Sequence, residues 1–423
     1  MKNPNIQLPS LQAQTFVLDN QTPLYFFPNK DLNVIRLEFL FANAGKINQK
    51  KPFIATIANY MMTEGTKNFT AFGIAEALDY YGAFVEKFVN HEAASVVFYF
   101  MKKHTESLMP YIEDIICRPV FPQKELKTTI DKYKQKELIN QQKTSVVAAN
   151  KFYESIFEKT PYCLIGEAED FDLIERNDVT DFFNEFMAEQ NQMSIIASGD
   201  IDEAFLQSVN QTLGRAARKQ SKRLQLLEIP DYCAKPLPLM FSMPSASQVS
   251  LRIGKQTISH NDKDFLPLKV LNCVLGGYFG SRLMSNIRED KGLTYGINSA
   301  VLTHTNVGIM FVTADVKADK YETALKEIFS EMKILQNELI PEDELSLVKN
   351  YLKGEIMRSL DGSFDLGERF GYLISKGIDT DYFSDFANVV NSITALDLQT
   401  LAQHYLSAES FTQIVVGNFG KTQ

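Results

Sequence analysis

An arginine and a tyrosine seven residues apart are the clearest candidates for chemistry in this chain. Arg288 ends a short helical pattern, and Tyr295 follows a glycine turn at Gly292, where we expect a strand to start. Taken singly, the arginine is a typical surface ion-pair residue and the tyrosine a typical strand aromatic. Together they offer a planar fork of donors and a hydroxyl, two groups suited to binding peptide carbonyl oxygens. The spacing therefore predicts that both face one cleft.

Three glycines precede this pair. Gly276, Gly277 and Gly280 lie in the stretch GGYFGSR, where the backbone can turn sharply or approach a ligand closely. The stretch lacks the spacing and the lysine of a Walker phosphate loop, and it follows a predicted helix instead of a strand. Two interpretations remain open: a tight turn between helices, or a flexible loop that contacts a peptide.

The composition is that of a globular protein with an acidic balance. The 423 residues are 45% hydrophobic, and the formal net charge of -9 disfavours a nucleic-acid-binding face. A basic cluster between Arg215 and Arg223 is interpreted as a solvated linker. No apolar run reaches the ~18 residues of a membrane span, and no secretory signal is visible at the N-terminus. We expect a cytoplasmic protein, or a periplasmic one if a leader has been removed.

The order of predicted elements repeats in the two halves of the chain. Corresponding features are separated by offsets of 210, 214 and 218 residues, for the pairs Gly82 and Gly292, Phe98 and Val312, and Gly199 and Gly417. Such a repeat predicts an α+β fold of two homologous domains, each a mostly antiparallel sheet with helices packed on one face. The expected division is a domain at 1–218, a proline-containing linker at 219–238 and a domain at 239–423.

Two strands carry specific expectations about burial. Residues 32–41 alternate in polarity, which predicts a half-buried strand with Arg36 and Glu38 facing solvent. A second strand follows Gly82. Its aromatics Phe84 and Phe88 are four residues apart and are expected to lie in the core.

The stretch GGYFGSRLMSNIREDKGLTYGINSA, residues 276–300, resembles the glycine-rich turn, helix and Arg/Tyr pair of the M16 metallopeptidases. This is the group of pitrilysin and the mitochondrial processing peptidase, and the likeness is to its subfamily B. The turn at 64–67 and the segment at 160–162 also resemble family members. The resemblance covers nearly the whole chain and implies the two-domain M16/LuxS-like metallohydrolase fold.

The zinc motif of that family, HxxEH, is absent. Its positions correspond to Thr56, Asn59 and Tyr60, so that both histidine ligands and the general-base glutamate are replaced. The remaining glutamate ligand of the family falls at Lys136 or the adjacent Glu137. A catalytic zinc needs three deprotonated protein ligands and an open position. We therefore expect no metal in this chain.

No other metal-binding spacing is present in the sequence. The four cysteines show no CxxC pair, and the five histidines form neither HExxH nor HxxEH. The neighbours His91 and Glu92 are expected to be solvated polar surface.

The resemblance implies a zinc-less accessory subunit of a two-chain zinc endopeptidase. Tyr295 would donate to a substrate carbonyl or developing oxyanion, Arg288 would hold a neighbouring carbonyl, and the glycines 276, 277 and 280 would contact the peptide. The zinc would come from an HxxEH-bearing partner, in a heterodimer or through self-association, and the substrate would be a peptide or an unfolded polypeptide. The strand after Gly82 departs from the Asn-Ala-x-Thr-like pattern of active members, so a peptide added to a sheet edge would more readily join the partner. The alternative is an inactive scaffold, similar to the core subunits of the respiratory bc1 complex.

Overall fold

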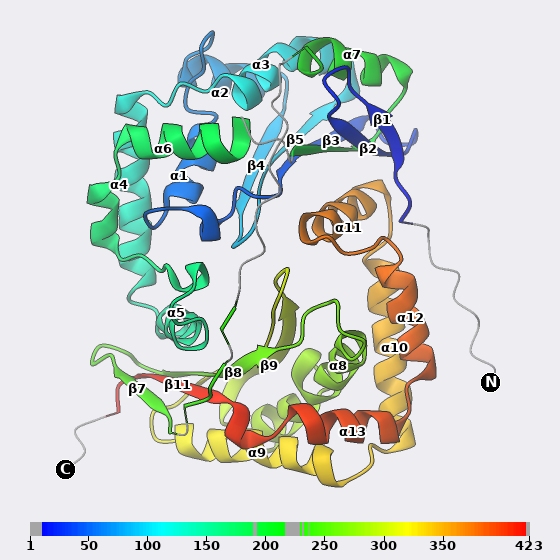
Figure 1. Ribbon diagram of the computed structural model, residues 1–423. Helices are drawn as coiled ribbons and strands as arrows, with labels where there is room; N and C mark the ends of the chain where they lie inside the picture. The colour runs from blue at the N-terminus through cyan, green and yellow to red at the C-terminus, as the bar shows by residue number, and fades with distance from the viewer. Residues whose placement is uncertain (1–10, 189–192, 216–228, 231, 236, 420–423) are drawn as a thin grey trace.

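Two β-sheets and the helices packed on them make up the molecule (Figure 1). The structure is a computed structural model that describes residues 11–188, 193–215, 229–230, 232–235 and 237–419. The predicted linker at 219–238 and its basic cluster lie mostly outside the described residues. The division into domains therefore stays a prediction.

The first sheet has six strands in the order β1-β2-β6-β3-β5-β4, and β4 forms one edge. All neighbours are antiparallel except β2 and β6. The strands are β1 (Gln14–Val17), β2 (Pro23–Pro28), β3 (Val34–Phe41), β4 (Phe84–Val89), β5 (Ala94–Met101) and β6 (Met193–Gly199). The helices of this half are α1 (Ile54–Met61), α2 (Ala71–Tyr80), α3 (Thr105–Cys117), α4 (Gln123–Asn140), α5 (Thr144–Ile156), α6 (Arg176–Phe183) and α7 (Glu203–Leu213).

The second sheet has five strands in the order β7-β11-β8-β10-β9, and β9 forms one edge. The strands are β7 (Leu239–Ser242), β8 (Val249–Thr257), β9 (Thr294–Thr303), β10 (Gly308–Val316) and β11 (Thr412–Gly417). The helices are α8 (Phe265–Asn272), the π-helices η6 (Cys273–Gly277) and η7 (Met284–Asp290), α9 (Tyr321–Asn337), α10 (Glu342–Arg358), α11 (Ser363–Lys376), α12 (Tyr382–Ser392) and α13 (Ala395–Tyr405).

The strand order of the second sheet repeats that of β2-β6-β3-β5-β4 in the first. The first pair in each of these strand orders is parallel, namely β2 with β6 and β7 with β11. The other pairs are antiparallel. The predicted duplicated α+β fold with mostly antiparallel sheets is confirmed.

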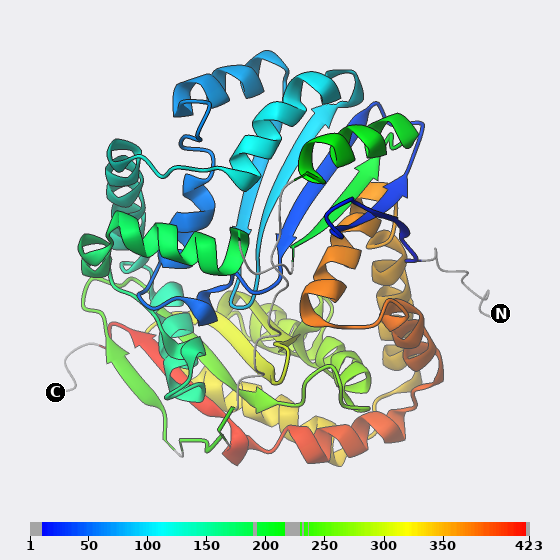
Figure 2. The ribbon, with the colours of Figure 1, turned by 45° about the horizontal axis from the view of Figure 1, so that its top comes forward.

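One helix from each half of the chain packs on the sheet of the other half. Helix α5 packs on β8 and β11 of the second sheet, and α11 packs on β2, β3 and β6 of the first. Figures 1 and 2 show α11, in orange, beside the strands of the first sheet although it belongs to the second half of the chain. The two halves are therefore interlocked by the exchange of one helix each.

This exchange corrects the predicted burial of β3. Arg36 and Glu38 are only 4% and 7% exposed, because α11 covers the face that was expected to meet solvent. The two side chains form an ion pair there, with Arg36 Nη2 donating to Glu38 Oε2 at 2.8 Å. The strand is thus buried on both faces.

The prediction for Phe84 and Phe88 is also wrong. Their side chains are 59% and 53% exposed on the edge strand β4. Helix α11 packs against β2, β3 and β6 and contacts β4 less. The outer edge of this face therefore remains exposed to solvent.

Candidate functional site

Helix α1 carries the three positions that correspond to the zinc motif. It begins after Phe53, whose backbone is left-handed with φ of 68°, and its apolar face enters the first core. Asn59 is fully buried, and its amide Nδ2 donates to the carbonyl oxygens of Phe88 and Ser95, at 3.0 and 3.2 Å. Those two residues face each other across β4 and β5. Asn59 therefore ties the helix to this hairpin.

Tyr60 packs against the ring of Tyr133 and the ammonium group of Lys87. The ring of Tyr60 packs edge-on against Tyr133 of α4, with centroids 5.0 Å apart. Lys87 reaches over from β4, donates to Thr63 Oγ1 at 2.6 Å and to the carbonyl of Tyr60 at 3.0 Å, and lies 5.2 Å from the Tyr60 ring. Burial lowers the pKa of Lys87 to about 8, although Glu64 acts in the opposite direction.

These residues do not fit a zinc ion. Thr56 offers a hydroxyl, Asn59 offers an amide already bound to backbone, and Tyr60 offers a phenol whose ring packs on another tyrosine. On α4, Lys136 lies over the Tyr133 ring at 5.7 Å, and Glu137 lines a separate cavity. Among the described residues, no group of three or more His, Cys, Asp or Glu side chains is placed to hold a metal ion.

Arg288 and Tyr295 lie on neighbouring elements, η7 and the edge strand β9. Gly292, with φ of 59°, makes the turn between them. The Tyr295 side chain is 88% exposed, and the guanidinium of Arg288 lies 4.6 Å from the ring centre of Phe279, itself 63% exposed. No hydrogen bond joins this arginine to this tyrosine, and neither lines the three cavities described below.

The glycines before the pair form the turn between η6 and η7. Gly276 is buried against β9: a Cβ atom there would lie 2.6 Å from Ser299 Oγ and 2.8 Å from its backbone nitrogen. At Gly277 a Cβ would meet Asn272 at 3.2 Å, whereas at Gly280 it would meet only the ring of Tyr278. Close approach of η6 to the strand therefore accounts for Gly276. Contact of the three glycines with a peptide stays a prediction.

The prediction that His91 and Glu92 are solvated surface is wrong. Glu92 is 6% exposed and joins the two halves of the chain: it accepts hydrogen bonds from Tyr162 Oη at 2.9 Å and from the backbone of Thr305 at 2.7 Å, and it pairs with Lys376 of α11. Burial opposes its charge, but Lys376 and the Thr305 N–H outweigh burial and lower the pKa of Glu92 to about 2. Tyr162 belongs to the 160–162 segment of the family resemblance, a signal that would have pointed to this cluster.

Two histidines flank Glu92. The His91 ring stacks on Tyr153 with centroids 4.7 Å apart, and His304 lies edge-on to His91 at 5.1 Å. Burial is the main cause that lowers the pKa of His91 to about 3 and that of His304 to about 4. Burial also raises the pKa of Tyr153 to about 12. Both imidazoles and the phenol are therefore neutral at neutral pH.

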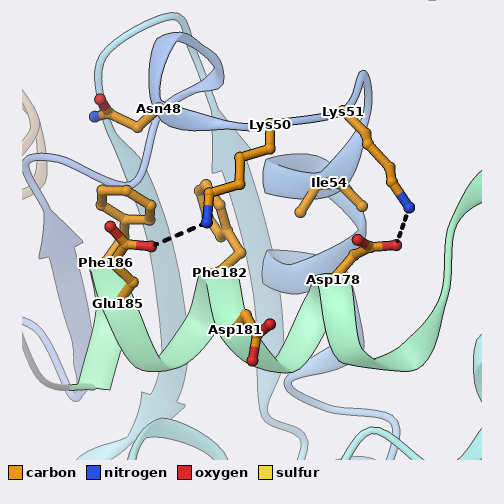
Figure 3. A pocket seen from close by; sticks show the side chains of 9 residues that line it. All are labelled: Asn48, Lys50, Lys51, Ile54, Asp178, Asp181, Phe182, Glu185 and Phe186. Atoms are coloured by element: carbon orange, nitrogen blue, oxygen red, sulfur yellow. Dashed lines mark hydrogen bonds and ion pairs between the residues drawn. The ribbon is translucent and has the colours of Figure 1, made fainter.

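Three of the cavities that described residues form bear on the site. One of about 250 Å³ lies between α4, α5 and the segments at 46–53 and 161–166, and His91 lines it. Another, of about 310 Å³, lies between the end of α5 and residues 230 and 232–235. The smallest, of about 50 Å³, lies between α1 and α6, where Lys51 pairs with Asp178 and Lys50 with Glu185 (Figure 3). It is too small for more than one or two water molecules.

The family model of the peptidase M16 inactive domain matches residues 174–352 of this chain. An uncharacterized zinc protease, YmxG, of Bacillus subtilis is 23% identical over 85% of this chain and 86% of its own length. A probable inactive metalloprotease, YmfF, of the same species is 22% identical over 56% of this chain and 55% of its own length.

Solved structures share the whole fold. The crystal structure of a peptidase M16 inactive domain from Pseudomonas fluorescens matches with a TM-score of 0.87 and 20% identity, over 97% of this chain and 99% of that one. A chain of complex III2 from Candida albicans matches with a TM-score of 0.74 and 14% identity, over 96% of both chains. No helix among the described residues is long and apolar enough to cross a membrane.

Proposed function

Because the chain belongs to the M16 peptidase family as an inactive homologue, we propose that it is the zinc-less accessory subunit of a two-chain zinc endopeptidase. Its partner would be an M16 chain of subfamily B with an intact HxxEH motif, which would supply the zinc and the activated water. The substrate would be a peptide or an unfolded polypeptide. This chain would contribute contacts to the peptide.

The exposure of Tyr295 is the observation that carries the proposal. A tyrosine that is 88% exposed on an edge strand contributes little to folding, and its hydroxyl is free to donate to a ligand. The neighbouring element η7 adds a second donor group, Arg288, which lies against a second exposed aromatic, Phe279. Arg, Tyr and Phe are the residue types that bind peptides and proteins at exposed sites.

In the proposed complex, Tyr295 donates to the oxygen of the scissile carbonyl as negative charge develops on it. Arg288 uses its fork of N–H groups on a neighbouring carbonyl and orients the peptide. Loss of one such oxyanion donor lowers turnover by about 10²–10³ in other hydrolases.

A second candidate function is that of a structural M16 homologue without a role in proteolysis. Tyr295 is 88% exposed and Phe279 is 63% exposed, as expected of side chains that bind a partner subunit. The similarity of fold to a chain of complex III2 agrees with such a role. Under this alternative, Tyr295 and Phe279 bind a partner subunit and no peptide is cut.

The test is to mix the purified chain with an HxxEH-bearing M16 chain from the same genome. We expect cleavage of a quenched fluorescent peptide only in the mixture. The variant Tyr295→Phe should lower kcat by about 10²-fold while the Kd of the two chains stays unchanged. Tyr80→Phe is the matched control, because Tyr80 is 82% exposed on α2 and should leave kcat unchanged.

Two outcomes contradict the accessory role. One is an unchanged kcat for Tyr295→Phe in an active complex. The other is a stable complex with no cleavage of any peptide, which would favour the structural alternative.

A further inference from the structure

The 250 Å³ cavity beside His91 carries groups that the peptidase role does not use. Lys46 enters it from the turn after β3, and Glu137 enters it from the last turns of α4. The charges of the two side chains interact electrostatically, yet no direct ion pair joins them. An ammonium and a carboxylate thus line the same cavity without forming an ion pair with each other.

Most of the remaining wall of the cavity is aromatic or apolar, and Gln49 and Asn150 add two uncharged amide groups. The stacked rings of His91 and Tyr153 form one side, and Phe53 and Leu164 line another. The His91 ring makes no hydrogen bond to any other described residue, and its low pKa keeps it neutral. The cavity therefore has two opposite charges at fixed positions and an otherwise uncharged lining.

This arrangement selects a ligand by charge. A simple anion would be attracted by Lys46 and repelled by Glu137, and a simple cation would meet the reverse. A ligand with both charges satisfies both groups. The volume is about that of eight water molecules at roughly 30 Å³ each, below the range of drug-sized ligands. A free amino acid of moderate size has a comparable number of non-hydrogen atoms.

We propose that this cavity is a binding site for a free, zwitterionic α-amino acid. Lys46 binds its carboxylate, Glu137 binds its ammonium group, and its side chain lies against the aromatic and apolar walls. The proposal goes beyond the accessory peptidase role and does not rest on it, so failure of partner-dependent cleavage leaves it standing.

The test uses the full chain alone. A thermal-shift screen of the protein amino acids at about 10 mM selects the best ligand, and isothermal titration calorimetry gives its Kd. We expect the zwitterion to bind at least about tenfold more tightly than its N-acetyl form and its amide form, since each of these lacks one charge. This comparison needs no variant and so does not depend on the folding of one.

Variants then test whether Lys46 and Glu137 are the groups that bind the charges of the ligand. Lys46→Met and Glu137→Gln should each weaken binding at least about tenfold. The matched controls are Lys50→Met and Glu185→Gln, the surface pair beside the 50 Å³ cavity, which should change the Kd by less than about twofold.

Several results would overturn the proposal. No binding by any amino acid at about 10 mM would remove the site. Equal binding of the N-acetyl form would assign the cavity to a peptide C-terminus, and equal binding of the amide form would assign it to a peptide N-terminus. An unchanged Kd in both cavity variants would place the ligand elsewhere.

Discussion

Asn59 has a structural role at the position that the family resemblance assigns to the general base. Its amide donates to two carbonyl oxygens inside the β4–β5 hairpin, where a carboxylate could only repel them. The departure of α1 from the zinc motif thus involves more than missing ligands. The helix is held in place by a bond that a glutamate cannot make.

We predict that Asn59→Glu, the change that restores the family's general base, destabilises the protein without creating activity. An unpaired carboxylate at a fully buried position should lower the free energy of unfolding by about 3 kcal/mol or more. Urea unfolding at pH 7 measures the loss. Thr56→His on the same helix is the control, because Thr56 is only half-buried and should cost much less. Equal losses in the two variants would remove the role given to Asn59.

Residues whose types suit catalysis or binding could be identified from the sequence, whereas the side chains that surround them could not. Arg288 and Tyr295 are on adjoining elements, as their spacing around Gly292 predicts. The burial of Glu92 was missed because its partners Thr305 and Lys376 are 213 and 284 residues away. Local pattern carries no information about contacts at that separation.

The same limit appears at the scale of elements. Periodicity and the repeat between halves predict the duplicated fold, since each strand and helix leaves its own pattern. The exchange of α5 and α11 leaves no local trace. It decides that β3 is buried on both faces and that Arg36 and Glu38 must pair.

Gly367 makes the docking of α11 testable. A Cβ atom there would lie 2.2 Å from Ser198 Oγ of β6, so the helix approaches the sheet more closely than alanine allows. We predict that Gly367→Ala lowers the free energy of unfolding by about 1–3 kcal/mol through overpacking. Thermal and urea unfolding measure the change.

Gly354 supplies the control for this substitution. It lies inside α10, is exposed, and has no neighbouring atom within 4 Å of the place that an alanine methyl group would occupy. Gly354→Ala should therefore raise stability by about 0.5–1 kcal/mol through helix propensity. If both variants gain stability, α11 is not held closely on the first sheet.

At the scale of the whole molecule, the two halves are joined by a buried polar cluster as well as by exchanged helices. Glu92 and His91 come from the first half, and His304, Thr305 and Lys376 come from the second. Because these histidines and Glu92 are buried with lowered pKa values, the free energy of unfolding should fall in acid.

We predict that stability falls as the pH drops below about 6.5. The pKa values of His91 and His304 are lowered in the fold to about 3 and about 4, so the unfolded chain takes up these protons first. Their contribution is present above the ordinary histidine pKa and is lost as the pH falls towards the folded values. Glu92, with its pKa lowered to about 2, adds a further loss below its ordinary pKa of 4.5.

His304→Asn isolates one of these groups. Between about pH 6 and pH 4.5, each proton taken up only by the unfolded chain adds a slope of about 1.4 kcal/mol per pH unit. Removing His304 should reduce the slope of unfolding free energy against pH by up to that amount, as measured by urea unfolding at several pH values. His404→Asn, at an exposed position on α13, should leave the slope unchanged. A slope that is the same in wild type and His304→Asn would mean that His304 does not contribute to the loss of stability in acid.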